Sequence, residues 1–246
     1  MIEARGLVKT FKTGLFGLGS SINVLKGFDF DAYPGQVTGI LGPNGSGKTT
    51  FFRGIAGLES FNQGSLLVDG INPEANPSFI RGKVALLPEE PGIYSHDTGL
   101  EHLTLFGVMS GLSKEENRIL LKESDEMLGL STFWTRDFRT YSRGQKSRIA
   151  LARLHFFKDA NVLIFDEPSN GLDFESVGRL HRFIRQKAQE GKTVLVASHI
   201  VNDLKNLCDR IVGIQDGRAA NEATVNQWID DHALATSAPI KGYKDE

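Results

Sequence analysis

The sequence predicts an α/β fold in which a mostly parallel β-sheet is covered by helices and interrupted by a helical insertion. Short apolar runs recur along the 246-residue chain, at 36–41, 83–87, 161–165, 193–198 and 210–214. They lack strict polar–apolar alternation, which is typical of strands buried on both faces of a parallel sheet. Residues 92–157, between the second and third runs, show helical patterns instead. We therefore expect a layered core with a helical subdomain inserted into it.

The inserted stretch contains two capped helices. One opens at Ser113, has Glu116 three residues later and stops near Gly129, and the other opens at Ser142 with Gln145 in the matching position. Both pairs are capping-box patterns. The expected apolar faces are Ile119, Leu120, Met127 and Leu128 on the first, and Ile149, Ala150 and Leu154 on the second. A third stripe is expected to be core, with a docking face for a partner as the alternative: Leu100, Leu103, Phe106 and Met109.

Composition excludes several classes of protein. A net charge of −2 provides no basic field for nucleic acid, so nucleic-acid binding is not expected as the main activity. One cysteine, Cys208, excludes an intrachain disulfide and a cysteine-based metal cluster. The amino terminus lacks the apolar core of a secretory signal, and no run reaches the roughly 20 apolar residues that span a bilayer. Any membrane role is therefore expected to come through a partner.

The stretch ILGPNGSGKTT at 40–50 matches the phosphate-binding pattern G-x-x-x-x-G-K-[ST]. It follows the apolar run 36–41 and precedes a helical pattern that begins near Lys48. Glycines let successive backbone N–H groups face phosphate oxygens, and the helix N-terminus adds a positive dipole end. We expect Lys48 to point at the β- and γ-phosphates and not to be buried, and Thr49 to bind Mg²⁺. The predicted phosphate-contacting residues are Gly42, Pro43, Asn44, Gly45, Ser46, Gly47, Lys48, Thr49 and Thr50.

This loop predicts nucleoside triphosphate binding but leaves the reaction open, because kinases, GTPases and motor ATPases share it. A flexible turn ahead of a helix is the structural alternative. VLIFDE at 162–167 adds two carboxylates at the end of an apolar run. Asp166 is placed to hold Mg²⁺, and Glu167 to act as general base on water. A surface acid pair capping a strand is the alternative, although an acid directly after apolar residues suggests a cation that offsets its desolvation.

His199 follows the run 193–198, at the strand ends where ligands collect in open parallel sheets. It is placed to contact the γ-phosphate, with an ordinary hydrogen-bonded histidine as the alternative. Considered together, the motifs resemble those of the ATP-binding subunit of an ATP-binding-cassette (ABC) transporter over residues 2–220. GPNGSGKT resembles the Walker A motif and VLIFDE the Walker B motif with Glu167 as catalytic base. SNGLD resembles the D-loop with Asp173 as its aspartate.

The most specific part of the resemblance is YSRGQ at 141–145, which is similar to the family signature LSGGQ. Ser142, the backbone N–H of Gly144 and the helix N-terminus behind them would form an anion site. By the resemblance, Arg143 and Gln145 also belong to the nucleotide-binding residues. In the family this site contacts the γ-phosphate held by the opposite subunit. The resemblance therefore implies that two copies dimerise head to tail. It also implies that Phe11 stacks on adenine, and that His199 is the switch histidine.

Two positions depart from the family pattern. Arg143 replaces the second signature glycine, where it would be tolerated if its side chain points outward and would add positive charge near phosphate. Glu89 replaces the Q-loop glutamine, and a carboxylate there can still bind Mg²⁺ but cannot donate a hydrogen bond. The predicted metal ligands are therefore Thr49, Glu89 and Asp166, and the predicted catalytic residues Lys48, Glu167 and His199. PEEPGIY with YSRGQ is most similar to the ABC-2 type, which mainly serves export.

The resemblance implies an ABC ATPase domain over 1–220, with a P-loop core at about 1–91 and 158–220 around the helical subdomain at about 92–157. It also implies an antiparallel β part near the N-terminus, and a C-terminal tail follows at 221–246. The expected activity is ATP hydrolysis with Mg²⁺, coupled to a separate membrane permease at the cytoplasmic face of the cell membrane. A soluble ABC ATPase acting on ribosomes or DNA, or a P-loop kinase, are the alternatives.

Overall fold

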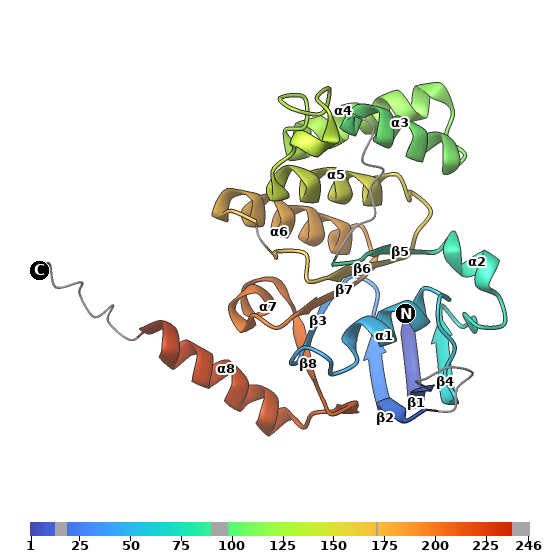
Figure 1. The fold of residues 1–246 in the computed structure, drawn as a ribbon, viewed down its shortest axis with the longest axis vertical. Helices are drawn as coiled ribbons and strands as arrows, with labels where there is room; N and C mark the ends of the chain where they lie inside the picture. Colours follow the sequence, from blue (N-terminus) through green and yellow to red (C-terminus); the bar gives the residue numbers. More distant parts are fainter. Residues whose placement is uncertain (13–18, 90–97, 171, 238–246) are drawn as a thin grey trace, which may run out of the picture.

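The computed structural model describes residues 1–12, 19–89, 98–170 and 172–237, with side chains given as far as residue 231 in the last helix. A six-stranded sheet forms the centre (Figure 1), in the order β5-β6-β7-β3-β8-β9. All of its strand pairs are parallel except β8 with β9. The strands are β3 (Val37–Leu41), β5 (Val84–Leu87), β6 (Val162–Asp166), β7 (Thr193–Ser198), β8 (Arg210–Gln215) and β9 (Arg218–Ala219).

These strands confirm the five predicted apolar runs to within one residue at each end. Every residue of β3, β6 and β7 is buried, as expected for central strands covered on both faces. The phosphate-binding stretch follows β3, and the acid pair ends and follows β6. Because β3 and β6 both flank β7 and run parallel, their carboxyl ends meet at one edge of the sheet.

A second, antiparallel sheet lies near the N-terminus, as the fold class predicts. Its order is β2-β1-β4, with β1 (Ile2–Lys12), β2 (Ser21–Ala32) and β4 (Gln63–Val68). Helix α1 (Lys48–Ile55) packs between the two sheets. The rings of Phe28 and Phe30 each lie 5.0 Å from that of Phe51 on α1. This fully buried aromatic cluster fixes the helix that carries the phosphate loop.

The remaining helices divide into two groups (Figure 1). The predicted helical subdomain contains α3 (Gly99–Met109), α4 (Lys114–Leu128), the 3₁₀ turn η2 (Phe138–Thr140) and α5 (Arg143–His155). The others flank the sheets: α2 (Pro77–Arg81), α6 (Phe174–Gln189), α7 (Val201–Leu207) and α8 (Glu222–Ser237). One hydrophobic core runs from the subdomain, including Leu103 and Leu128, to sheet residues such as Phe165. The predicted start of the subdomain, at 91–92, lies outside the described residues.

Both predicted capping boxes are present, and Gly129 ends α4 in a left-handed conformation. The predicted apolar face of α4 is wrong in one residue, because Ile119 is 43% exposed. The buried stripe instead includes Asn117 and Ser124. Asn117 Nδ2 donates to the Thr104 carbonyl at 2.9 Å, and Ser124 Oγ lies 3.2 Å from His155 Nδ1. Polar side chains that have hydrogen-bond partners thus occupy buried positions of α4, where a purely hydrophobic pattern would not place them.

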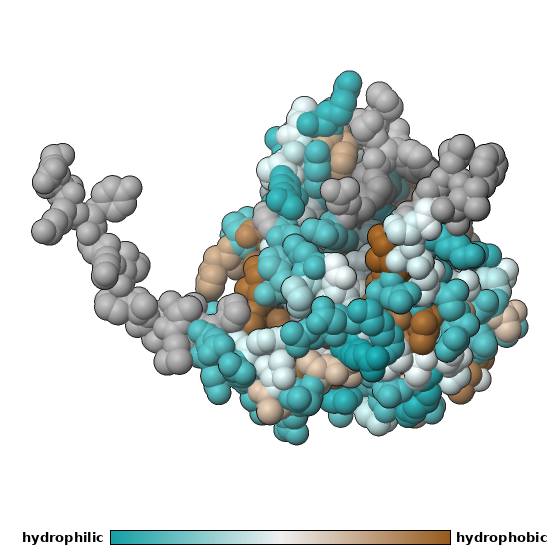
Figure 2. Space-filling model, turned by 60° about the horizontal axis from the view of Figure 1, so that its bottom comes forward, coloured by the Kyte–Doolittle hydropathy of each residue, from teal (hydrophilic) through white to brown (hydrophobic). Residues whose placement is uncertain are grey.

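The stripe on α3 is core only in part. Leu103 is fully buried, and Phe106 packs against the main core, but Met109 is 71% exposed. Its neighbours Leu105 and Val108 are also exposed. Figure 2 shows another face of the molecule, on which hydrophilic side chains predominate and apolar ones form small separate groups. Within the described residues, no helix is long and apolar enough to cross a membrane.

Candidate functional site

The phosphate-binding loop connects β3 to α1, and two of its glycines are required by geometry. Gly47 caps α1 with φ at +112°, a conformation that side-chain-bearing residues rarely adopt. A Cβ on Gly42 would lie 2.4 Å from the Ile214 carbonyl oxygen, so any side chain there would push β8 away. The loop borders a cavity of about 300 Å³. The predicted residues that line it are Asn44, Gly45, Gly47, Lys48, Thr49, Thr50, Glu89, Asp166 and Glu167.

Lys48 is buried, with 6% of its side chain exposed, so the expectation that it is not buried is wrong. Its Nζ donates to the carbonyl oxygens of Gly42 at 2.7 Å and Pro43 at 3.2 Å. It also lies 3.5 Å from Glu167 Oε1. Two loop carbonyls and an acid are therefore the partners of this ammonium group. Burial remains compatible with phosphate binding, because Lys48 lines the cavity.

Thr49 and Asp166 form the part of the site that fits a divalent cation. Thr49 Oγ1 donates to Asp166 Oδ2 at 2.6 Å, while the buried Asp166 Oδ1 accepts no hydrogen bond from the described residues. Burial raises the pKa of the Asp166 carboxyl, the hydrogen bond from Thr49 opposes this, and the charge of Glu167 adds to it. An unpartnered carboxylate oxygen beside a hydroxyl is a donor set that Mg²⁺ accepts. A cation there would favour the charged carboxylate.

The predicted third metal ligand, Glu89, lines the same cavity but has a partner of its own. Asn170 Nδ2 donates to Glu89 Oε1 at 3.1 Å. Within the described residues no cluster of three or more His, Cys, Asp or Glu side chains is arranged to hold a metal ion. A cation at Thr49 and Asp166 would therefore take its other oxygens from elsewhere, such as phosphates and water, as Mg²⁺ commonly does. The metal role of Glu89 stays a prediction.

Glu167 is held in an unusual position. Its φ is +49°, a left-handed conformation that is uncommon for residues other than glycine. Its backbone N–H donates to the Ala197 carbonyl at 3.0 Å, which joins the end of β6 to β7. Glu167 Oε2 lies 2.8 Å from Nδ1 of His199, and Glu167 Oε1 lies 3.5 Å from Nζ of Lys48. The structure thus brings together all three residues predicted to be catalytic. Strain of this kind is concentrated at functional sites.

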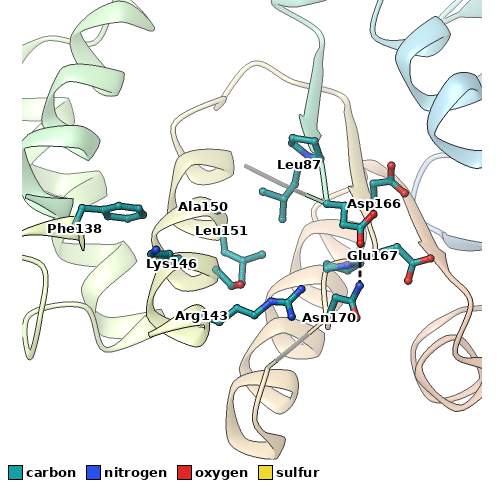
Figure 3. A pocket seen from close by; sticks show the side chains of 13 residues that line it. Leu87, Phe138, Arg143, Lys146, Ala150, Leu151, Asp166, Glu167 and Asn170 are labelled. Carbon is teal, nitrogen blue, oxygen red and sulfur yellow. Dashed lines mark hydrogen bonds between the residues drawn. The ribbon is translucent and has the colours of Figure 1, made fainter. Parts of the chain in front are cut away.

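The signature stretch forms the start of α5. Ser142 Oγ accepts from the Gln145 N–H at 3.3 Å, and Gln145 Oε1 accepts from the Ser142 N–H at 3.0 Å. Arg143 does not simply point outward. It is exposed but lines a second cavity, of about 480 Å³, with Glu89, Asp166, Glu167 and Asn170, and Figure 3 shows it extending from α5 toward Asn170.

Asp173 caps α6, where its carboxylate accepts from the Ser176 N–H at 2.8 Å and the Ser176 hydroxyl at 3.1 Å. These hydrogen bonds lower the pKa of Asp173. Asp173 also lies close to Gly144, since a Cβ on that glycine would be 3.7 Å from Asp173 Oδ2. Among the described residues that line the phosphate cavity, none comes from the signature Ser142, Gly144 and Gln145 or from Asp173. The residues predicted to bind phosphate therefore fall into two groups, one around this cavity and one at the start of α5.

Phe11 is not among the described residues that line the phosphate cavity, and Lys9 Nζ lies 4.7 Å from its ring centroid. Its adenine-stacking role stays a prediction. Sequence reasoning missed Val24, which lines the cavity from β2. It also missed Asn170, the partner of Glu89, although Asn170 stands inside the SNGLD stretch. Trp228 belongs to none of the sequence motifs, and it borders a third cavity with Gly42, Pro43 and His199.

Comparisons with known proteins agree with this site. A sequence model of the family described as ABC transporter matches residues 25–170. The ABC transporter ATP-binding protein NatA of Bacillus subtilis (strain 168) is 35% identical over 184 residues, which cover 74% of each chain. The L-cystine transport system ATP-binding protein TcyN of Escherichia coli (strain K12) is 32% identical over 240 residues, covering 94% of this chain and 92% of TcyN.

Among solved structures, the ATP-binding cassette MJ0796 in a dimeric post-hydrolysis state bound to ADP and Pi superposes with a TM-score of 0.80. It is 26% identical, and the match covers 90% of this chain and 97% of that one. The chain belongs to the ABC transporter family, as an ATP-binding subunit. Its predicted fold class is confirmed, and it is an ATPase that converts ATP and water to ADP and phosphate.

Proposed function

We propose that two copies of this chain close head to tail around ATP, and that closure and hydrolysis drive a separate membrane permease. One observation carries the proposal. The chain has a complete loop-and-acid half-site around one cavity, whereas its signature residues Ser142, Gly144 and Gln145 lie outside that cavity. In a symmetric dimer, the signature of each copy would lie at the open side of the other copy's phosphate loop.

Within each composite site, the chain's own groups divide the chemistry. Lys48 and the loop N–H groups would bind the β- and γ-phosphates. Thr49 and Asp166 would hold Mg²⁺, which supplies charge neutralisation on the phosphate oxygens. Glu167 would accept a proton from the attacking water. His199, whose Nδ1 lies 2.8 Å from Glu167 Oε2, would orient the Glu167 carboxylate. For this, Lys48 must exchange the carbonyls of Gly42 and Pro43 for phosphate oxygens.

The exposed apolar side chains support the two proposed interfaces. Phe174 directly follows the D-loop Asp173 and is 95% exposed, which suits a residue that a second copy covers. On the helical subdomain, Leu105, Val108 and Met109 of α3 are exposed on a helix whose other side is core. Solvent-exposed apolar clusters on a helix commonly mark protein contacts. We assign this α3 surface to the permease, which would hold the subunit at the cytoplasmic face of the cell membrane.

The sequence pattern supports the finer features of the proposal. PEEPGIY with YSRGQ favours the ABC-2 type and hence export, with residues 90–94 of the first stretch outside the described residues. We retain the proposed division into an ATPase domain at 1–220, with its core at about 1–91 and 158–220 and its subdomain at about 92–157. The remaining residues, 221–246, follow it.

Substitution of the proposed base tests the dimer model. Glu167→Gln should lower ATP turnover by at least about 100-fold, because the amide cannot accept the proton. With ATP and Mg²⁺ the variant should run as a stable dimer in size-exclusion chromatography with light scattering. Glu126→Gln, on the exposed side of α4, is the matched control and should behave like the wild type. A Glu167→Gln chain that stays monomeric at saturating ATP contradicts the head-to-tail model.

The permease surface has its own test. The double substitution Val108→Asp and Met109→Asp should prevent the chain from being recovered with membranes of its native host. Introduced into the Glu167→Gln chain, the same double substitution should leave ATP-driven dimerisation unchanged. Ile119→Asp, an exposed apolar residue on α4, is the control for a general effect of added charge. Recovery with ribosomes instead of membranes would overturn the transport role in favour of a soluble ABC ATPase.

A further inference from the structure

The C-terminal helix α8 lies beyond the proposed domain boundary at residue 220 and packs against the ATPase core. Val225 is buried, and Trp228 and Ile229 pack against the main core. Gly213 of β8 makes room for the helix. A Cβ at this position would lie 2.7 Å from Val225 Cγ2 and 3.1 Å from Trp228 Cζ3. The sequence from 221 onward is mostly polar and gives little sign of this packing.

Trp228 extends this packing to the nucleotide site. Gly213 pairs with Leu41, the residue just before the phosphate loop. Trp228 lines a cavity of about 320 Å³ whose other walls include Gly42, Pro43 and His199. An aromatic side chain from a helix far along the sequence therefore faces the start of the loop and the switch histidine at once.

The same three wall residues anchor the catalytic groups. The carbonyls of Gly42 and Pro43 accept hydrogen bonds from Lys48 Nζ, and His199 Nδ1 lies 2.8 Å from Glu167 Oε2. The His199 side chain is 41% exposed and has room to change its orientation. A large, rigid indole that shares this cavity with them limits the space into which they could move.

We propose that Trp228 is a positioning residue for ATP hydrolysis, which sets the position of His199 and of the loop carbonyls that hold Lys48. This inference rests on the proposed roles of Lys48, Glu167 and His199, and not on dimerisation or on the permease. Docking of α8 would thereby control turnover, and any partner that pulled α8 away would slow it.

The test uses the full chain and separates positioning from simple stability. Trp228→Ala should lower kcat by about 10-fold with a smaller change in KM, because a misplaced general base costs rate more than binding. Trp228→Phe should recover kcat to within about 2-fold, since a ring still fills the wall. Val225→Ala is the matched control on the same helix, and it should lower the melting temperature without lowering kcat.

A second variant keeps Trp228 in the sequence but moves it. Gly213→Ala should displace α8 and lower kcat as Trp228→Ala does. Fluorescence provides an independent readout, because the chain has two tryptophans, Trp134 and Trp228. In a Trp134→Phe background, addition of ATP and Mg²⁺ should change the emission of Trp228.

Two results would overturn the inference. One is that Trp228→Ala and Val225→Ala both lower kcat, each by an amount that follows its loss of stability. The other is that the emission of Trp228 does not respond to ATP in a chain that hydrolyses it. If instead the proposed catalytic roles were wrong, Glu167→Gln would keep hydrolysing ATP, so the two kinds of failure can be told apart.

Discussion

Two helix N-termini in this chain carry phosphate-binding sequences, and they are built in different ways. α1 starts behind the left-handed Gly47, and Lys48, Thr49, Asp166 and Glu167 line the cavity beside it. α5 starts at an exposed surface, where Ser142 and Gln145 satisfy each other in a capping box. The first device includes carboxylates that can bind a metal ion or accept a proton, whereas the second has N–H groups, a hydroxyl and the cation of Arg143 but no carboxylate. Under the proposed head-to-tail arrangement, the second device would contribute to a site whose reacting groups belong to another copy.

The largest effect is expected at the first device. Lys48→Ala should reduce ATP hydrolysis by at least about 100-fold, because it removes the buried cation from the phosphate cavity. A steady-state phosphate-release assay measures this. Lys122→Ala, at an exposed lysine on α4, is the control and should leave the rate unchanged. If Lys48→Ala hydrolysed ATP as fast as Lys122→Ala, the first device would not be the one that carries the reacting groups.

Asp166→Asn should separate stability from activity. Burial raises the pKa of Asp166, so this carboxyl destabilises the fold increasingly as the pH rises above the ordinary aspartate pKa, and to the full extent above the raised value. The amide should raise the melting temperature by about 2–4 °C for each kcal/mol relieved. This gain should be greatest near neutral pH and disappear as the pH falls below the ordinary aspartate pKa, where both side chains are neutral.

The same variant should lose hydrolysis and the extra stabilisation that Mg²⁺ adds to ATP binding. Differential scanning fluorimetry with ATP, with and without Mg²⁺, measures both effects. Asp159→Asn, outside the site, is the control. A normal Mg²⁺-dependent shift in Asp166→Asn would exclude Asp166 as a metal ligand.

The two departures from the family pattern should act as a pair, with a smaller effect. Arg143 and Glu89 carry opposite charges and line one cavity. Arg143→Gly and Glu89→Gln should each change kcat/KM by about 2–5-fold, and the double variant should recover part of the loss, with a coupling of at least about 0.5 kcal/mol. Both side chains are exposed, so the coupling should weaken in high salt. Additive effects at low salt would mean that the departures are independent.

The smallest effect concerns the stability of the helical subdomain. Burial lowers the pKa of His155 to about 4, below its ordinary value of 6.5. The unfolded chain then binds the proton first, so stability should fall as the pH falls from about 6.5 to 4. In His155→Gln, the drop in melting temperature between pH 7 and pH 5 should be smaller than in the wild type. Identical drops would show that His155 does not contribute to acid sensitivity.

Much of this architecture follows from local sequence rules. The apolar runs predicted the parallel strands because central strands need apolar residues on both faces, and Ser113 and Ser142 predicted helix starts because capping is local. The order of the Walker A, signature and Walker B stretches predicted the family. The strand ends predicted that His199 would lie near a ligand, and the resemblance assigned Glu167 and His199 their catalytic roles.

Other features depend on tertiary contacts that no local rule contains. Ile119 and Met109 fit helical apolar stripes, yet both are exposed, because the packing of α3, α4 and α5 selects a different face. Lys48 is buried because Gly42 and Pro43 turn their carbonyls toward it. Trp228 reaches the site only because Gly213, in β8, has no side chain.

The central claim, that each site combines the loop of one copy with the signature of another, is tested most directly by mixing two inactive variants. Lys48→Ala removes the loop cation. Ser142→Asp keeps the helix cap but repels phosphate from the signature. Mixed dimers would contain one intact composite site, so the mixture should regain up to about a quarter of wild-type hydrolysis. A mixture that stays as inactive as the separate variants, although it forms dimers with ATP, would contradict the claim.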